Sequence, residues 1–295
     1  MVYSDKTYKI GSVIVLYNPD DKLVGECLDS IIPQVDEVCV VDNSTSSHVL
    51  PLTGYGSKVY YKALGKNIGI AAAQNIGIRY LAEKGCDFIV FSDQDSSSPH
   101  DLVEKLVRAY MILSRDTDIA CVGPMPINRK TGCPYIYKNC IISENTVSGI
   151  PYYCMHSILS SYSLVPLSNF SVVGNMDEGL FIDFVDDDWC WRAKAFHGKS
   201  SVMLQDVTIH HELGVSSRFM GRQISVSSPF RIYYQTRNLL WMCRKSYVPT
   251  YWKRMNLVKL MIKLVYYSAF SDNRLKYIGR MFHGFYDGLF KYRKK

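Results

Sequence analysis

Short apolar runs alternate with segments of helical periodicity along the first 123 residues of the chain. Because most of these runs are apolar at consecutive positions, they indicate strands that are buried on both faces of a sheet. The predicted strands are residues 12–17, 37–42, 58–62, 87–92 and 118–123. Apolar positions three and four apart predict helices over residues 22–32, 69–83 and 99–115. This alternation predicts an α/β fold with a mostly parallel sheet covered by helices on both faces.

The pattern changes in the second half of the chain. Residues 124–175 consist of short segments with turn residues, which predict less regular structure. We expect a helix over 179–196, a strand over 200–204, a mobile loop over 212–228 and a helix over 229–244 that begins with Pro229. We therefore expect one catalytic or binding domain over residues 1–245, followed by an amphipathic helical appendage over residues 246–295.

Composition narrows the class of protein. The chain has 295 residues, of which 47% are hydrophobic and 21% charged, so it can bury a sizeable core and is not a disordered chain. It contains no apolar run long enough to cross a membrane, and its first residues lack the apolar segment of a signal peptide. The nine cysteines include no Cys-x-x-Cys pair, which favours reduced thiols in a cytoplasmic protein over a zinc site.

Positive charge is concentrated at the C-terminus. Residues 251–295 contain eleven basic and two acidic residues, a net charge of +9, whereas the first 250 residues carry −2. The same segment has apolar and aromatic residues at helical spacing. A basic amphipathic segment is typical of attachment to an anionic membrane surface, so we expect a peripheral protein. The alternatives are a helical cap packed on the main domain or a contact in a homo-oligomer. No nucleic-acid-binding motif accompanies the charge.

Polar residues follow several of the predicted strands. Tyr17 and Asn18 follow the first strand, Asp42 ends the second, and Asp93-Gln94-Asp95 follows the strand over 87–92. In a parallel sheet these positions lie on one edge, where ligands bind. Asp93 and Asp95 could hold Mg²⁺ or Mn²⁺ against a diphosphate, since such cations prefer oxygen ligands. The alternative is a solvated acidic turn.

Four further segments could carry chemistry. Asn67 and Gly69 enter a helix where small residues permit close approach of either a ligand or a packed neighbour. The run from Asp186 to Asp188, followed by Trp189, could supply a general base and a surface for a sugar ring, or could stabilise a helix start. His211 is either a metal ligand or an ordinary histidine. Arg231 and Arg237 share a helical face that could bind phosphate or face solvent.

Taken in order, these segments resemble members of glycosyltransferase family 2, which have the GT-A fold with a Rossmann-like central sheet. The similar segments are YNP at 17–19, VVDNS at 40–44, NIGIA at 67–71, DQD at 93–95, DEGLFID at 177–183, VDDDW at 185–189 and HELG at 211–214. They span about residues 9–245. The segments around Asp186 and Arg237 look most like those of bacterial rhamnosyltransferases that assemble cell-surface polysaccharides.

The resemblance implies a role for each candidate residue. Asp186 matches the catalytic base, while Asp95 and His211 match metal ligands. Asp188 and Trp189 would orient the acceptor sugar. The remaining matches would bind the donor: Tyr17, Asn18, Asp42, Asn67, Gly69, Asp93, Arg231 and Arg237. Two departures from the family pattern occur, because Val185 stands where many members have Glu and Ser161 stands where relatives often have Gly.

The resemblance also implies a reaction. An inverting, metal-dependent transferase would move a sugar, L-rhamnose from dTDP-L-rhamnose in the favoured interpretation, to a hydroxyl of a lipid-linked saccharide at the cytoplasmic face of the bacterial inner membrane. The assembly of a cell-surface polysaccharide or O-antigen is the expected setting. Another donor such as UDP-galactose or UDP-N-acetylglucosamine is the alternative, as is a non-catalytic protein that binds a nucleotide-sugar. A processive synthase is disfavoured, because those enzymes carry membrane-spanning helices and a Gln-x-x-Arg-Trp motif.

Overall fold

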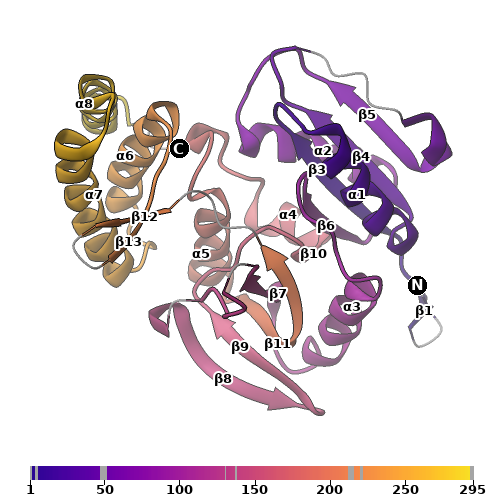
Figure 1. The fold of residues 1–295 in the computed structure, drawn as a ribbon. Coiled ribbons are helices and arrows are strands. Elements are labelled where there is room, and N and C mark those ends of the chain that lie inside the picture. The colour runs from indigo at the N-terminus through magenta and orange to yellow at the C-terminus, as the bar shows by residue number, and fades with distance from the viewer. Residues whose placement is uncertain are drawn as a thin grey trace.

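The computed structural model describes residues 2–3, 6–46, 52–129, 131–136, 138–211, 216–219 and 222–292. Its centre is a nine-stranded sheet with the strand order β5-β4-β3-β6-β10-β7-β11-β9-β8. The parallel strands are β3 (Ile10–Leu16), β4 (Glu37–Asp42), β5 (Val59–Ala63), β6 (Phe88–Asp93), β7 (Ile119–Asn128) and β11 (Ser200–His211). The antiparallel strands are β10 (Leu164–Pro166), β9 (Ile150–Met155) and β8 (Ile141–Val147). The expected mostly parallel sheet is confirmed (Figure 1).

Helices cover both faces of this sheet. On one face, α1 (Asp21–Ile31) and α3 (Leu102–Leu113) bury their apolar sides together with Ile10 and Ile14 of β3. On the other face, α2 (Ile70–Glu83), α4 (Leu167–Val173) and α5 (Val185–His197) pack with Val13 of the same strand. Successive residues of a strand point to opposite faces, so β3 must be apolar at nearly every position, as its sequence is.

Three helices form a further layer beside α5, shown in orange and yellow at the left of Figure 1. They are α6 (Pro229–Arg244), α7 (Thr250–Phe270) and α8 (Arg274–Phe290). Gly284 and Gly288 let α8 lie against α6, because a Cβ at Gly284 would come 2.6 Å from the carbonyl oxygen of Tyr233. Trp252 and Met281 belong to the same hydrophobic cluster as Val185 of α5. The predicted division at residue 245 therefore does not separate two cores.

Shorter elements complete the described chain. Two-stranded pairs are formed by β1 (Val2–Tyr3) with β2 (Lys6–Thr7), and by β12 (Ser216–Phe219) with β13 (Arg222–Ser225). Short 3₁₀ segments occur at Ile32–Gln34, Leu52–Lys58, Lys138–Cys140 and Glu178–Leu180, and the second is interrupted by non-helical backbone at Gly56. None of the helices in the described ranges has the length and hydropathy needed to cross a membrane.

The structure corrects several predicted boundaries. Residues 124–175 are more regular than expected, because they hold the end of β7, the β8–β9 hairpin, β10 and α4. The polar strand β8 lies at the edge of the sheet with alternately exposed residues, so it lacks the apolar run that identifies a buried strand. The predicted helix over 179–196 begins only at Val185, the strand predicted over 200–204 continues to His211, and the loop expected over 212–228 contains β12 and β13 in its described part.

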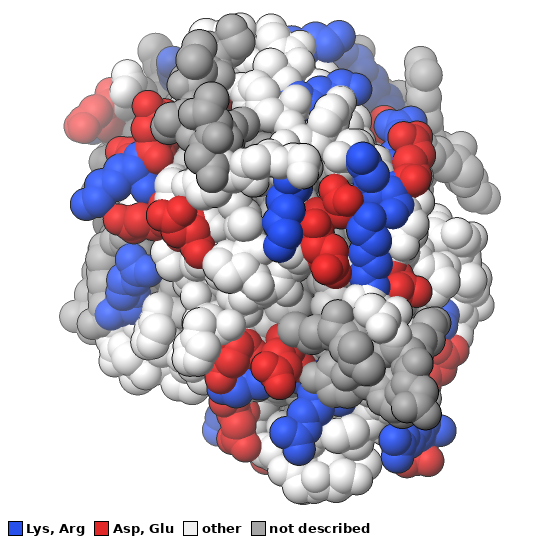
Figure 2. Space-filling model, turned by 90° about the vertical axis from the view of Figure 1, so that its right-hand side faces the viewer, with Lys and Arg blue, Asp and Glu red and all other residues white. Residues whose placement is uncertain are grey.

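The face of the molecule that lies away from α6–α8 carries both signs of charge. Lysine and arginine side chains alternate there with aspartate and glutamate side chains (Figure 2). Ion pairs in the first half of the chain include Lys105–Asp101 at 2.7 Å and Lys22–Glu26 at 3.8 Å. The excess positive charge of the chain is thus not a property of every face, which agrees with its concentration in residues 251–295.

Candidate active site

The loops that follow β3, β4 and β6 are joined by hydrogen bonds at the edge of the sheet where the carboxyl ends of these strands lie. The main-chain N–H of Tyr17 donates to Oε1 of Gln94 at 2.7 Å, and Nε2 of Gln94 donates back to the carbonyl of Tyr17 at 3.3 Å. The N–H of Asn18 donates to the hydroxyl of Ser44 at 2.9 Å. Tyr17, Asn18, Asp42 and Asp93, which sequence analysis assigned to one edge, are therefore brought together.

Asp42 organises the turn after β4 from inside the protein. Its side chain is 1% exposed, and its carboxylate accepts hydrogen bonds from the N–H of Ser44 at 3.0 Å and from the hydroxyl of Tyr61 at 2.7 Å. A buried carboxylate needs such partners. Asp42 therefore positions the residues of this edge from beneath.

The loop before α2 is fixed by two asparagines. Nδ2 of Asn43 donates to Oδ1 of Asn67 at 3.0 Å, and Oδ1 of Asn43 accepts from the N–H of Ile68 at 2.8 Å. Gly69 has φ of 88°, and a Cβ there would come 2.6 Å from the carbonyl oxygen of Phe181. The absence of a side chain at Gly69 therefore makes room for Phe181 of the same protein. Sequence analysis did not assign a role to Asn43, although its place directly after Asp42 was a usable signal.

The segment that leads into α5 has an unusual backbone. Phe181, Asp183 and Phe184 have φ of 66°, 64° and 66°, a left-handed conformation that costs free energy for residues other than glycine. Asn238 of α6 offsets this cost. Its side chain is 0% exposed, and its Nδ2 donates to the carbonyls of residues 180, 182 and 183 at 2.7, 2.8 and 3.3 Å. Asn238 was missed as a functional candidate, although it directly follows Arg237.

Asp186 lies in the first turn of α5, at the positive end of the helix dipole. Its carboxylate accepts from the N–H of Ser160 at 3.3 Å and from the N–H of Asp187 at 3.0 Å. The side chain is half-buried, and burial raises the pKa of Asp186. A carboxylate with a raised pKa is better suited than an ordinary one to take a proton from a hydroxyl group.

Asp187 forms an acidic pair with Asp186. Burial and the neighbouring charge of Asp186 raise the pKa of Asp187 to about 7. The hydroxyl of Ser157 donates to Oδ1 of Asp187 at 2.5 Å, which favours the ionised form. Because the two carboxylates are adjacent, their protons leave as those of a coupled pair. Asp187 was not singled out by sequence analysis.

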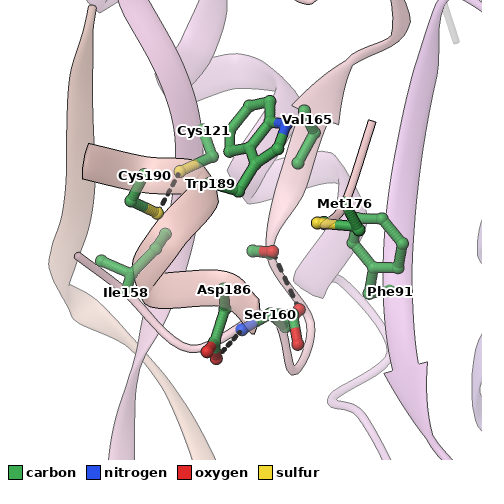
Figure 3. A pocket seen from close by; sticks show the side chains of 10 residues that line it. Phe91, Cys121, Ile158, Ser160, Val165, Met176, Asp186, Trp189 and Cys190 are labelled. Carbon is green, nitrogen blue, oxygen red and sulfur yellow. Dashed lines mark hydrogen bonds between the residues drawn. The ribbon is translucent and has the colours of Figure 1, made fainter. Parts of the chain in front are cut away.

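A small pocket opens beside Asp186, and apart from space that is open to solvent it has room for about one water-sized group. Figure 3 shows Asp186 and Ser160 at one end and the sulfur atoms of Cys121 and Cys190, 3.9 Å apart, at another. The residues that line it come from β6, β7, β10, α5 and the loops between them: Phe91, Cys121, Ile158, Ser160, Ser163, Val165, Met176, Asp186, Trp189 and Cys190.

The predicted acceptor residues Asp188 and Trp189 have partners inside the protein. Asp188 is 0% exposed, and its carboxylate accepts from Arg192 at 2.9 Å, from Lys245 at 2.7 Å and from the hydroxyl of Tyr247 at 2.7 Å. Trp189 is 2% exposed, although it lines the inner wall of the pocket. This geometry does not support the implied contact between Asp188 and an acceptor sugar. Asp188 instead joins α5 to the segment before α7.

The two arginines of α6 differ in accessibility. Arg231 is 51% exposed and makes an ion pair with Asp183 at 2.7 Å, and its hydrogen bonds to Asp183 raise its pKa. The guanidinium of Arg237 lies over the ring of Trp241 at 4.1 Å and donates to the carbonyl of Gly179 at 2.6 Å. Arg237 therefore braces the segment before α5, whereas Arg231 is open to an anionic ligand.

Lys263 adds a cation from α7 that sequence analysis did not identify. Its Nζ donates to Oε1 of Gln235, on α6, at 2.7 Å. Burial lowers the pKa of Lys263 to about 8, and the charges of Asp183 and Arg231 act on it in opposite directions. The segment beyond residue 245 thus reaches the same neighbourhood as Arg231.

The predicted metal ligands are only partly brought together. Asp93 ends β6 and is half-buried, while Asp95 is exposed, with the hydroxyl of Ser96 at 3.4 Å from its carboxylate. His211 ends β11 opposite Asn128, but its side chain lies outside the described part of the chain. Within that part, no three His, Cys, Asp or Glu residues form a group that could hold a metal ion. Carboxylate oxygens are the donor type that a hard cation prefers, so the chemistry of Asp93 and Asp95 is compatible with such an ion.

Comparison with known proteins adds two findings on sequence. The profile of the family described as "Glycosyl transferase family 2" matches residues 12–139. The dTDP-rhamnosyl transferase RfbF of Shigella flexneri is 34% identical over 289 residues, which is 95% of this chain and 95% of that protein.

Solved structures give the same fold at low sequence identity. GalNAc-T7, crystallised with UDP, GalNAc and Mn²⁺, has a TM-score of 0.56 and 13% identity over 92% of this chain, which spans only 59% of the GalNAc-T7 chain. Residues 1–349 of TarS from S. aureus, in complex with UDP-GlcNAc, have a TM-score of 0.56 and 15% identity over 95% of this chain and 81% of that one. The expected GT-A fold is thereby confirmed.

Proposed function

Because the chain belongs to glycosyl transferase family 2, we propose that it transfers L-rhamnose from dTDP-L-rhamnose to a hydroxyl of a saccharide acceptor, with inversion at the anomeric carbon. The choice of donor is supported by the likeness to RfbF, which extends over 95% of both chains. The family alone supports the transfer of a sugar and leaves the donor open.

The observation that carries this proposal is the position of Asp186. This carboxylate has a raised pKa and lies at the start of α5, next to the pocket. The segment that precedes it in the chain is held in place by contacts with α6 and with the start of α2. A structural carboxylate would be better placed in ion pairs, as Asp188 is. Asp186 accepts only main-chain hydrogen bonds among those found for it, so it can take up a proton without breaking an ion pair.

In the proposed reaction Asp186 takes the proton of the acceptor hydroxyl as its oxygen attacks the anomeric carbon. The nucleoside diphosphate leaves from the opposite side of the sugar, so the configuration inverts. General-base catalysis of this kind contributes roughly 10²–10⁴-fold to the rate. Arg231 stabilises the negative charge that develops on the diphosphate, since its guanidinium is half-exposed and can turn from Asp183 to a phosphate.

We propose that the edge formed by Tyr17, Asn18 and Asp42 receives the nucleoside, with Asp42 acting from beneath through the turn after β4. Asn67 and Gly69 would bound the donor from the side of α2, and Asp93 would meet the ribose or a metal-bound water. Asp95 and His211 would hold Mg²⁺ or Mn²⁺. Such an ion would neutralise charge on the diphosphate.

The acceptor is proposed to be lipid-linked, with the enzyme held peripherally on the cytoplasmic face of the inner membrane. The support is the outer surface of α7 and α8, which exposes large apolar side chains: Leu257 40%, Val258 55%, Met261 57%, Val265 54%, Leu275 87%, Phe282 65%, Tyr286 58% and Phe290 71%. Exposed cations such as Arg254, Lys276 and Arg280 lie on the same helices. Apolar and basic residues together favour an anionic bilayer surface. We propose that transfer to such an acceptor serves the assembly of a cell-surface polysaccharide or O-antigen.

The test is the release of nucleoside diphosphate from a panel of nucleotide-sugars, combined with thermal shift in the presence of Mn²⁺ or Mg²⁺. We expect dTDP-L-rhamnose to stabilise the protein most and to release dTDP. Faster release of UDP from UDP-galactose or UDP-N-acetylglucosamine would overturn the proposed donor. Binding of nucleotide-sugars without any release, even with saccharide acceptors present, would overturn the proposed enzyme activity.

A further inference from the structure

The inner walls of the pocket beside Asp186 are apolar and buried, whereas its entrance is polar. Phe91, Ile158, Val165 and Met176 are between 2% and 6% exposed. Ser160 and Asp186 are half-buried and lie together at one end in Figure 3. A ligand that enters past Asp186 therefore meets hydrocarbon and sulfur surface on the inside.

The few polar atoms in these walls are already engaged. The hydroxyl of Ser163 donates to the carbonyl of Ser160 at 2.8 Å, and the indole N–H of Trp189 donates to the carbonyl of Gly174 at 2.8 Å. The thiols of Cys121 and Cys190 face one another at 3.9 Å. These wall donors are therefore already used, so a hydroxyl group placed here would accept no hydrogen bond from them in exchange for those it loses to water, whereas a methyl group would lose none.

The position of the pocket selects which methyl group could enter. In a pyranose, the carbon that carries C6 and the anomeric carbon are both bonded to the ring oxygen. The C6 substituent therefore lies within one ring width of the carbon at which transfer occurs. Asp186, as the proposed base, marks the place of transfer and lines the pocket.

We propose that this pocket receives the C6 methyl group of the transferred 6-deoxyhexose and thereby selects against hexoses with a hydroxyl at C6. The inference rests on the proposed function for the nature of the donor, and adds the residues that recognise it. Ile158, Met176 and Phe91 form the contact surface. Burying a methyl group is favourable, and burying a hydroxyl group without a hydrogen-bond partner is costly. Both effects favour a donor with a methyl group at C6 over one with a hydroxyl group there.

The test compares dTDP-L-rhamnose with dTDP-L-mannose, which differs only by a hydroxyl at C6. An apolar site that rejects a larger polar analogue typically does so by about 10²-fold. We expect the unaltered enzyme to prefer dTDP-L-rhamnose by that factor in kcat/KM for donor hydrolysis or transfer. Ile158→Ala and, from a second wall, Met176→Ala enlarge the pocket and should reduce the preference to roughly 10-fold or less.

Ile158→Phe fills the pocket and should raise KM for dTDP-L-rhamnose about 10-fold, while the Kd for dTDP, which has no sugar, stays unchanged. The matched control is Ile142→Ala, because Ile142 is 47% exposed on β8 and should leave the preference unaltered. An unchanged preference in both enlarged variants, with both donors still processed, would overturn the pocket assignment alone. Failure of the unaltered enzyme to use dTDP-L-rhamnose, or a preference for UDP-N-acetylglucosamine, would overturn the proposed donor and the assignment with it.

Discussion

The side-chain amide of Asn238 donates a hydrogen bond to the main-chain carbonyl of Ile182 at 2.8 Å, four residues before the proposed base. The same amide bonds the carbonyls of Leu180 and Asp183. We expect Asn238→Ala to lower kcat by more than it changes KM for the donor, because the left-handed segment before Asp186 loses its anchor. The carbonyls of Ile182 and Asp183 lose the hydrogen bond from Asn238, which should also lower the free energy of unfolding by roughly 1–3 kcal/mol.

Steady-state kinetics and thermal unfolding measure the two effects of Asn238→Ala separately. Asn256→Ala is a suitable control, because among the described residues the hydrogen bond found for its side chain goes to the carbonyl of Trp252, within its own helix α7. It should leave kcat unaltered. A loss of stability in Asn238→Ala with unchanged kcat would show that the anchor has no role in positioning Asp186.

The sequence predicts the parts of the fold that have a local signal, and it does not predict those that depend on contacts between residues far apart in the sequence. The strands β3, β4 and β6 were predicted because burial on both faces requires continuous apolar runs, which is a local signal. The edge strand β8 escaped prediction because one of its faces is solvated and its residues are polar. Gly284 and Gly288 are informative only once α6 is known to lie against them.

The same distinction applies to the candidate site. Asp42 and Asp93 could be assigned to one edge because they end parallel strands that lie on either side of β3. The sequence could not show that the space at Gly69 is taken by Phe181, or that Asp188 is neutralised by Lys245, since those partners are distant along the chain. Whether an acidic residue is free to act depends on such contacts. For this reason the sequence motif predicts a role in the reaction for both Asp186 and Asp188, although Asp188 is engaged in ion pairs.

Asp186→Asn should abolish most turnover and leave donor binding nearly unchanged. An amide keeps the shape of the side chain but cannot take up the proton of the acceptor hydroxyl, and general-base catalysis is worth roughly 10²–10⁴-fold. The measurement is kcat for transfer together with Kd for dTDP-L-rhamnose by calorimetry. Near-normal turnover in this variant would remove Asp186 from the role of base.

Asp187→Asn should shift the acid limb of the pH profile of kcat/KM to lower pH. The base must be ionised to act, so activity falls as the pH drops through the raised pKa values of the pair. Without the second carboxylate the mutual repulsion disappears, so Asp186 ionises at lower pH.

Ser157→Ala provides a second test of the acidic pair. Its hydroxyl favours the ionised form of Asp187, so its removal should raise the pKa of Asp187. Asp187 then stays neutral to higher pH and repels Asp186 less, so the acid limb should again move to lower pH, by less than in Asp187→Asn. Profiles that stay superimposable in both variants would mean that the pair does not govern the activity.

Asp95→Ala should abolish the metal-dependent part of donor binding. In the unaltered protein, a ligand at a hundredfold its Kd stabilises by about 2.7 kcal/mol, so Mn²⁺ with dTDP should raise the melting temperature by several degrees. We expect EDTA and Asp95→Ala each to remove that rise. Asp118→Ala is the control, since Asp118 is an exposed carboxylate paired with Lys199 on another part of the surface. An equal rise with EDTA, or in Asp95→Ala, would exclude a metal held by Asp95.

Phe282→Ser with Phe290→Ser should weaken attachment to anionic vesicles while leaving transfer to a soluble acceptor unchanged. The two rings are 65% and 71% exposed on α8, and burying a phenylalanine side chain in an apolar medium is worth about 1.5–3 kcal/mol.

Point substitutions are preferable to truncation at residue 245, because Trp252 and Met281 belong to the core that contains Val185. The matched control is Phe196→Ser, which removes a ring that is 61% exposed on α5. Co-sedimentation at low and high salt separates the apolar from the electrostatic contribution. Undiminished binding of the double variant at high salt would rule out this surface as the site of attachment.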